Sequence, residues 1–225
     1  MKKMIIDGNE ACSYASYLFT EAAGIYPITP SSPMAEHIDS WSSKGMTNIF
    51  DNKVNVVEMQ SEAGASGLVH GLLKGGVLTT TYTASQGLLL MIPNMYKMAG
   101  EMLPCVMHVA ARSLSTHALS ILGDHQDVYA TRMTGFNMIC SSNVEEANHF
   151  SALAHLSAID SSLPFMHFFD GFRTSHEINK VNVLEKEDLK DLINLDSLQN
   201  FRNRAINPNN PKTYGTNQND DIYFQ

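Results

Sequence analysis

Short apolar runs alternate with segments of helical periodicity along most of this 225-residue chain. Several of the runs are rich in β-branched residues, which favour strands, whereas the segments between them carry apolar residues at every third or fourth position. The expected strands are 25–28, 77–83, 104–111, 136–140 and 164–169, and the expected helices are 9–24, 32–44, 58–74, 88–101 and 142–160. This alternation predicts right-handed βαβ units and therefore an α/β fold with a doubly wound, mostly parallel sheet.

The predicted topology also indicates where a ligand binds. In open sheets of this kind, ligands occupy the crevice outside the carboxyl ends of the strands. That rule selects three loops of this sequence, residues 27–32, 84–87 and 112–117. We therefore expect the functional residues to lie in or beside these loops.

Composition excludes several classes of protein. Apolar residues make up 44% of the chain and charged residues 17%, which is typical of a globular protein. The net charge is −8 with no basic cluster, so nucleic acid is not an expected partner. No segment approaches the roughly 18 consecutive apolar residues of a membrane span.

The three cysteines, Cys12, Cys105 and Cys140, are far apart in the sequence. Without a Cys-x-x-Cys pair they do not indicate a zinc site or an iron–sulfur cluster built on this chain. Scattered cysteines in odd number are typical of reduced proteins inside the cell, so we expect a cytoplasmic location.

The sequence changes character after about residue 178, which predicts two regions. Residues 1–178 are expected to form the principal domain, and residues 179–225 a peripheral helix and a linker leading to a missing downstream domain. Residues 184–201 are charged with helical spacing, whereas 206–221 are rich in Asn, Pro, Thr and Asp, as linkers are. The apolar end, 222–225, is typical of a strand entering further protein; the remnant of a protease tag is an alternative that the preceding residues do not match. We expect a fragment, with a truncation or a separate subunit as alternatives.

Three residues are candidates for binding chemistry. Glu62 lies near the start of a helix rich in small residues, where its carboxylate either binds a ligand or simply complements the helix dipole. Arg112 follows the apolar strand 104–111 and either binds a carboxylate in a bidentate manner or makes an ordinary surface ion pair. Thr29 lies in a loop that two prolines stiffen, whose hydroxyls either bind a polar ligand or cap the next helix.

The histidines allow a further set of predictions. One group that is close in sequence resembles metal ligands, but its spacing fits no standard site, so we expect no metal there. Its members are His117, Asp124, His125 and Asp127. A second group lies on apolar faces and is expected to consist of core residues with one hydrogen bond each. Its members are His70, His108, His155 and His167.

Five long runs carry a resemblance to a known family. They are YPITPSS at 26–32, EMQSEAGASG at 58–67, TYTASQGLLLMIPNMYKMAGE at 81–101, HALSILGDHQDVY at 117–129 and PFMHFFDGFRTSHE at 164–177. In this order they resemble the first, pyrimidine-binding domain of the pyruvate:ferredoxin (flavodoxin) oxidoreductases. Because the similarity extends over essentially the whole chain, it is far more specific than a single short motif.

The resemblance implies a fold of the thiamine diphosphate-binding, pyrimidine-domain type, with the cofactor held between two domains. Glu62 resembles the glutamate that binds the aminopyrimidine ring and favours the imino tautomer, which takes the proton from the thiazolium C2. Thr29 and Arg112 resemble the groups that hold the 2-oxo acid, with Arg112 at its carboxylate. The cofactor acts as the electron sink of the reaction, and the protein orients the reactants.

Enzymes of this family decarboxylate pyruvate oxidatively to acetyl-coenzyme A and pass the electrons through iron–sulfur clusters to ferredoxin or flavodoxin. The Gly-Asp-Gly motif of the diphosphate and Mg²⁺ site is absent, since Gly123-Asp124 is followed by His125. We therefore expect Mg²⁺ and the clusters only in a complete enzyme, which is expected to be a homo-oligomer, and we expect this chain alone to be inactive. A catalytically silent dimerisation or docking module is the alternative; another thiamine enzyme, such as a transketolase, is a weaker one. The sequence does not separate pyruvate from a close 2-oxo acid.

Overall fold

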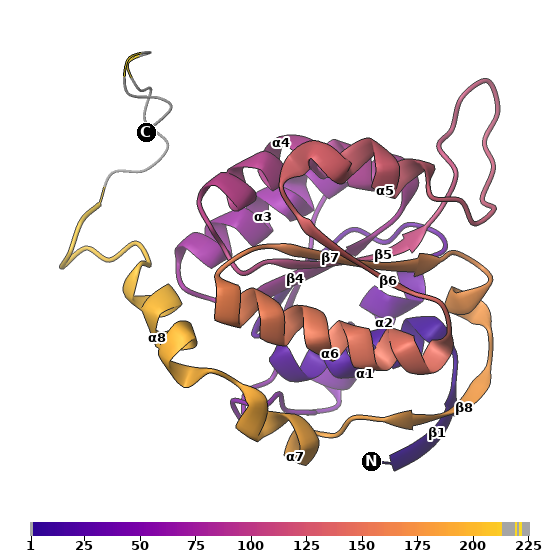
Figure 1. The fold of residues 1–225 in the computed structure, drawn as a ribbon, viewed down its shortest axis with the longest axis horizontal. Helices are drawn as coiled ribbons and strands as arrows, with labels where there is room; N and C mark the ends of the chain where they lie inside the picture. Colours follow the sequence, from indigo (N-terminus) through magenta and orange to yellow (C-terminus); the bar gives the residue numbers. More distant parts are fainter. Residues whose placement is uncertain (1, 213–218, 220, 222–225) are drawn as a thin grey trace.

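The computed structural model describes residues 2–212, 219 and 221, and its centre is a sheet of six parallel strands in the order β3-β2-β4-β5-β7-β6 (Figure 1). The strands are β2 (Ala22–Ile25), β3 (Asn55–Glu58), β4 (Thr79–Thr83), β5 (Val106–Ala111), β6 (Asn137–Ser141) and β7 (Phe165–Asp170). Each neighbouring pair is parallel. The predicted α/β class with a doubly wound, mostly parallel sheet is therefore confirmed.

Helices cover both faces of this sheet. They are α1 (Gly8–Phe19), α2 (Ser32–Ser43), α3 (Glu62–Lys74), α4 (Ser85–Gly100), α5 (Gln126–Thr131) and α6 (Val144–Ser161), with short 3₁₀ turns η1 (Arg132–Thr134) and η2 (Thr174–His176). In Figure 1, α3, α4 and α5 lie above the sheet, whereas α1, α2 and α6 lie below it. Because both faces are covered, the central strands β4 and β5 are buried along their whole length.

The predictions for β2 and for the segment that follows it were partly wrong. The strand ends at Ile25, so the expected strand 25–28 is three residues too late. Strand β3 was not expected, and the helix expected at 58–74 begins four residues later, at Glu62. A Cβ on Gly24 would lie only 3.1 Å from the carbonyl oxygen of Ala65 and from Val69. The absence of a side chain at Gly24 therefore lets α3 pack directly on β2.

The first strand of the chain pairs with a strand that follows the central sheet, and together they form a separate two-stranded sheet. Strands β1 (Lys2–Ile6) and β8 (Asn179–Val183) pair in antiparallel register, which the sequence analysis did not foresee. The expected helix 184–201 is divided into α7 (Lys186–Leu189), the 3₁₀ turn η3 (Lys190–Leu192) and α8 (Leu195–Asn203). Leu198 and Phe201 of α8 are buried in the main core. The expected apolar strand 222–225 lies outside the described residues.

Three histidines form a hydrogen-bonded chain in the core. Nδ1 of His108 lies 3.0 Å from Nδ1 of His167, and Nε2 of His108 lies 3.2 Å from Nε2 of His155. These three are core residues as predicted, but the expectation of one hydrogen bond each was wrong for all three. His167 also contacts Oγ of Ser141 at 2.7 Å, and His155 also contacts Oγ of Ser16 at 3.3 Å. His70 is only half-buried and takes part in an ion pair, so its assignment to the core was wrong.

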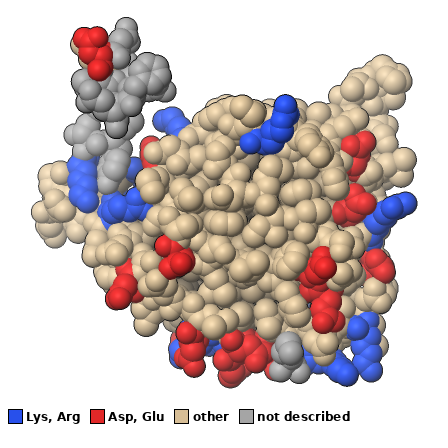
Figure 2. Space-filling view, viewed as in Figure 1, with Lys and Arg blue, Asp and Glu red and all other residues tan. Residues whose placement is uncertain are grey.

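The surface gives two further observations. On the face shown in Figure 2, acidic side chains gather toward the lower rim and basic side chains are interspersed among them. This face therefore presents no continuous basic surface. Among the described residues, no helix is both long enough and apolar enough to cross a membrane.

Candidate functional site

Three loops meet at the carboxyl edge of the sheet: residues 26–31 after β2, residues 84–87 after β4, and the segment that begins with Arg112 after β5. From β2 the chain continues to β3 on one side, and it then places β4 on the other side of β2. This reversal makes the ends of β2 and β4 a topological switch point, the position at which open α/β sheets bind ligands. The three loops overlap those expected from the sequence, which are residues 27–32, 84–87 and 112–117.

Arg112 is 5% exposed, and within the described residues its guanidinium donates hydrogen bonds to neutral groups. Nη1 donates a hydrogen bond to the carbonyl oxygen of Thr29 at 2.7 Å, and Nη2 donates one to Oε1 of Gln86 at 3.3 Å. Nε is buried without a partner, and no carboxylate among the described residues forms an ion pair with this side chain. Burial lowers the pKa of Arg112, and the charge of Asp127 opposes this effect. A buried cation in these surroundings favours the binding of an anion.

Glu62 is the first residue of α3, and its carboxylate faces the first turn of α4. The helix is capped by Ser61, whose hydroxyl accepts a hydrogen bond from the N–H of Gly64 at 3.1 Å. Glu62 is 7% exposed, and within the described part of the chain no residue donates a hydrogen bond to its side chain. Buried carboxylates normally accept hydrogen bonds, so this position suits a ligand that offers an N–H group.

Gly87 leaves the space that Glu62 occupies. A Cβ at this glycine would lie 2.8 Å from Cγ and Oε1 of Glu62, and 2.7 Å from Oγ1 of Thr83. Oγ1 of Thr83 is itself buried without a hydrogen-bond partner. A carboxylate and an unpartnered hydroxyl therefore lie together at the start of α4, where a polar ligand is able to satisfy both.

Thr29 lies in the exposed loop after β2, and its peptide bond to Pro30 is cis. Its main-chain carbonyl, rather than its hydroxyl, contacts Arg112. Asn9 of α1 supports the same loop, since its Nδ2 donates a hydrogen bond to the carbonyl oxygen of Pro30 at 2.9 Å, while its buried Oδ1 has no partner. The structure thus brings Thr29 and Arg112 into contact and connects them to Glu62 through the first turn of α4.

Two residues that support Arg112 were missed by the sequence analysis. Gln86 accepts a hydrogen bond from the guanidinium, and its Nε2 donates one to the carbonyl of Ser115 at 3.2 Å. Asp127, which the sequence grouped with superficially metal-like residues, is buried and accepts hydrogen bonds from main-chain N–H groups. Burial raises the pKa of Asp127, and these N–H groups oppose that effect. An acidic residue in the first turn of α5 was the only available signal, and it did not reveal burial.

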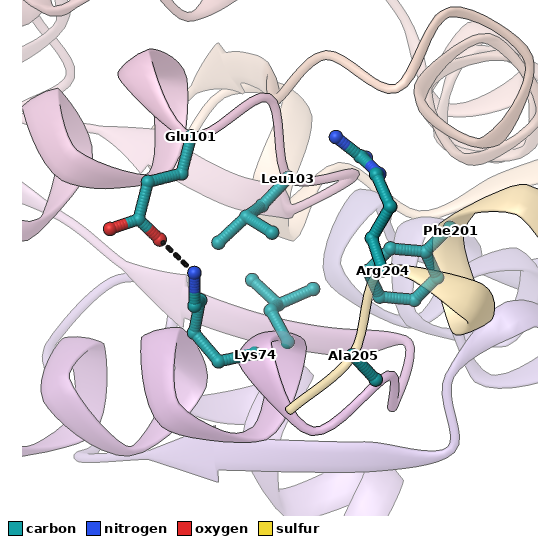
Figure 3. A pocket seen from close by; sticks show the side chains of 7 residues that line it. Lys74, Glu101, Leu103, Phe201, Arg204 and Ala205 are labelled. Carbon is teal, nitrogen blue, oxygen red and sulfur yellow. Dashed lines mark ion pairs between the residues drawn. The ribbon is translucent and has the colours of Figure 1, made fainter. Parts of the chain in front are cut away.

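A small cavity of about 40 Å³ lies elsewhere, between the ends of α3, α4 and α8 (Figure 3). One side is formed by the ion pair between Lys74 and Glu101, at 3.0 Å, and Phe201 lies on the other. Because Lys74 ends α3 and Glu62 begins it, this cavity is at the amino edge of the sheet. It is therefore separate from the loops described above.

Comparison with known proteins identifies the family of this chain. The family model described as pyruvate flavodoxin/ferredoxin oxidoreductase, thiamine diphosphate-binding, matches residues 14–225. The pyruvate:ferredoxin oxidoreductase of Moorella thermoacetica is 60% identical over 225 residues, which cover 100% of this chain and 19% of that protein. The pyruvate-flavodoxin oxidoreductase of Klebsiella pneumoniae is 58% identical over 224 residues, with the same coverage of 100% and 19%. The chain thus spans about a fifth of the length of these two curated relatives.

A solved structure supports the fold. It is the 2-oxoglutarate:ferredoxin oxidoreductase from Magnetococcus marinus with 2-oxoglutarate, coenzyme A and succinyl-CoA bound. The similarity has a TM-score of 0.73 at 19% identity and covers 83% of this chain and 32% of that chain. The family model and the two curated relatives show that the chain belongs to the thiamine diphosphate-binding family of pyruvate flavodoxin/ferredoxin oxidoreductases.

Proposed function

We propose that this chain forms the pyrimidine side of a thiamine diphosphate site in an enzyme that decarboxylates pyruvate oxidatively. The observation that carries the proposal is the pair of unsatisfied charges at one sheet edge. The buried Arg112 guanidinium has an unpartnered Nε, and the buried Glu62 carboxylate accepts no hydrogen bond from the described residues. One charge suits the carboxylate of a 2-oxo acid, and the other suits an N–H donor on a heterocycle.

The residues around Glu62 fit the aminopyrimidine ring of the cofactor. Gly87 provides the opening beside the carboxylate, and Oγ1 of Thr83 is a second polar atom without a partner. When bound, thiamine diphosphate supplies the electron sink that makes loss of carbon dioxide possible. The role of Glu62 is to hold a proton at a ring nitrogen, which a neutral amide in its place is not able to do.

Arg112 and Thr29 bind and orient the substrate in this proposal. The guanidinium offsets the negative charge of the oxo acid, and its hydrogen bonds to Thr29 and Gln86 fix the plane of the fork. Orientation of this kind converts binding energy into rate, since reacting groups are held in the required geometry. Pyruvate is the proposed substrate because the two curated relatives are named for it.

The remaining functions belong to the longer protein that we propose. They are the diphosphate and Mg²⁺ site, the iron–sulfur clusters, acyl transfer to coenzyme A, and electron transfer to ferredoxin or flavodoxin, in a cytoplasmic homo-oligomer. A direct test compares this chain with the complete polypeptide, using pyruvate, coenzyme A and a viologen dye as electron acceptor. We expect the complete protein to reduce the dye and the isolated chain not to reduce it. Dye reduction by the isolated chain, or failure of pyruvate to support reduction by the complete protein, would contradict the proposal.

A further inference from the structure

The carboxylate of Asp127 joins three separate segments of main chain. It is 0% exposed, and Oδ2 accepts hydrogen bonds from the N–H of Ser85 at 2.7 Å and from the N–H of Arg112 at 3.0 Å. Oδ1 accepts a hydrogen bond from the N–H of Val128 at 2.7 Å. One buried side chain therefore connects the start of α4, the end of β5 and the start of α5.

These hydrogen bonds of Asp127 lie just beyond the point at which β4 and β5 stop pairing with each other. The β4–β5 ladder ends at the pair Thr83 and Val109, after which the two strands have no further register. Ser85 then adopts a positive φ of 52°, which is uncommon for a residue with a side chain. The Asp127 carboxylate accepts hydrogen bonds from the segments that follow β4 and β5, just beyond the end of this pairing. It therefore replaces the missing sheet hydrogen bonds at the edge where the candidate site lies.

The charge of Asp127 is directed to main-chain groups instead of to the guanidinium. Its oxygens are occupied by three N–H donors, and no ion pair forms between Asp127 and Arg112. The negative charge still lies close enough to favour the charged form of Arg112. The arrangement favours the cationic form of Arg112 and leaves its buried Nε without a protein partner.

We propose that Asp127 is a positioning residue for 2-oxo acid binding, which acts by holding the main chain of Arg112 and Ser85 and not by contact with substrate. The inference rests on the proposed function, because it assumes that Arg112 binds the substrate carboxylate. The side chain must be a carboxylate in this role. An amide of the same shape has one oxygen and an NH₂ group, and the NH₂ would face a main-chain N–H instead of accepting from it.

The test is the Asp127→Asn variant of the complete enzyme, with the Michaelis constants for pyruvate and coenzyme A measured alongside kcat. Because small displacements of a binding group have large effects on rate and binding, we expect the KM for pyruvate to rise about tenfold or more. The KM for coenzyme A should change less than about threefold, since a positional effect at Arg112 is specific to the oxo acid.

A matched control is Asn48→Ala at the amino edge of the sheet. Asn48 is also 0% exposed, and its Oδ1 accepts hydrogen bonds from the N–H groups of Phe50 at 2.9 Å and Asn52 at 3.1 Å. This variant should lose stability without a selective change in the KM for pyruvate. Equal changes in both Michaelis constants for Asp127→Asn, or a selective change in the control, would overturn the inference.

A second variant keeps the inference testable if Asp127→Asn fails to fold. Asp127→Glu keeps the charge and lengthens the side chain by one methylene, and we expect a smaller but still selective rise in the KM for pyruvate. Arg112→Ala measured in parallel separates the two hypotheses. If Arg112→Ala leaves the KM for pyruvate unchanged, the proposed function fails; if it raises that KM while both Asp127 variants do not, only the positioning role fails.

Discussion

Nη1 of Arg112 lies 2.7 Å from the carbonyl oxygen of Thr29 and donates a hydrogen bond to it. The contact joins the loop after β2 to the end of β5, two segments that are 83 residues apart in the sequence. It also shows that Thr29 holds the arginine through its main chain, so the exposed threonine side chain takes no part in this contact. The position of the guanidinium is therefore determined by backbone geometry as much as by side chains.

Replacement of Arg112 should impair use of the oxo acid selectively. In the complete enzyme, Arg112→Ala should raise the KM for pyruvate far more than the KM for coenzyme A. Loss of a charge-assisted pair in a buried site costs about 2–5 kcal/mol. Arg112→Lys should recover only part of this loss, because the planar fork is absent. Steady-state kinetics with both substrates measures the effect, and equal changes in the two constants would indicate a structural arginine.

Replacement of Glu62 should separate folding from catalysis. Glu62→Gln keeps the size of a side chain that is 7% exposed, but it removes the carboxylate. The complete variant enzyme should fold and lose most of its turnover, whereas affinity for thiamine diphosphate should fall less. The measurement is proton–deuterium exchange at C2 of bound thiamine diphosphate, followed by NMR after an acid quench. Unchanged exchange with full turnover would show that Glu62 only complements the helix dipole, a contribution of about 0.3–1 kcal/mol to stability.

A methyl group at position 87 should displace the same carboxylate without removing it. In Gly87→Ala, the new Cβ would lie 2.8 Å from Oε1 of Glu62, closer than packed atoms approach one another. We expect a loss of turnover in the same direction as for Glu62→Gln, with a stability cost of about 1–3 kcal/mol from overpacking. Gly71→Ala is the control, because nothing lies within 4 Å of its Cβ position and it belongs to α3. Full activity of Gly87→Ala would mean that the position of Glu62 is not critical.

The buried histidine chain should make the fold sensitive to acid. Burial lowers the pKa of His155 and of His167 to about 3, and burial together with these two rings also lowers the pKa of His108. Unfolded histidines take up protons near pH 6.5, so stability is fully present above that pH and is lost as the pH falls from there toward 3. If all three take up a proton on unfolding, the free energy of unfolding should fall by about 4 kcal/mol per pH unit below pH 5.5.

Urea unfolding of this chain between pH 7.5 and 4.5 measures that slope. His155→Gln should reduce the slope by about one proton, since one titrating group is removed. His117→Gln is the control, because His117 is exposed and lies outside the buried histidine chain. A free energy of unfolding that is flat across pH 6.5, or an equal effect of the two variants, would contradict this account.

The sequence predicted the positions of strands β4, β5 and β7 better than the position of β2. Strand β4 is rich in β-branched threonine, and strands β5 and β7 are mostly apolar, so residue type identified all three. Strand β2 is Ala-Ala-Gly-Ile, and its first three residues are small and have little strand preference. The strand was therefore expected at the bulkier residues that follow, three positions too late. Its small residues are explained by the close contact with α3, which is a tertiary effect that local patterns do not contain.

The candidate site was predictable only in part. Its location followed from the rule for parallel sheets, and the roles of Thr29, Glu62 and Arg112 stay predictions that rest on resemblance. The contact between Arg112 and Thr29 was not foreseen, because it involves a main-chain carbonyl that no sequence pattern marks. Asp127 was missed for a related reason, since its partners are N–H groups that every residue carries.

The antiparallel ribbon of β1 and β8 has a practical consequence for dissecting this polypeptide. Residues 2–6 pair with residues 179–183, so the beginning of the chain depends on a segment that follows all six strands of the central sheet. A version shortened at residue 178 would leave β1 without its partner and would uncover the core positions that Leu198 and Phe201 fill. The shortest piece that retains these contacts extends through α8 to Asn203.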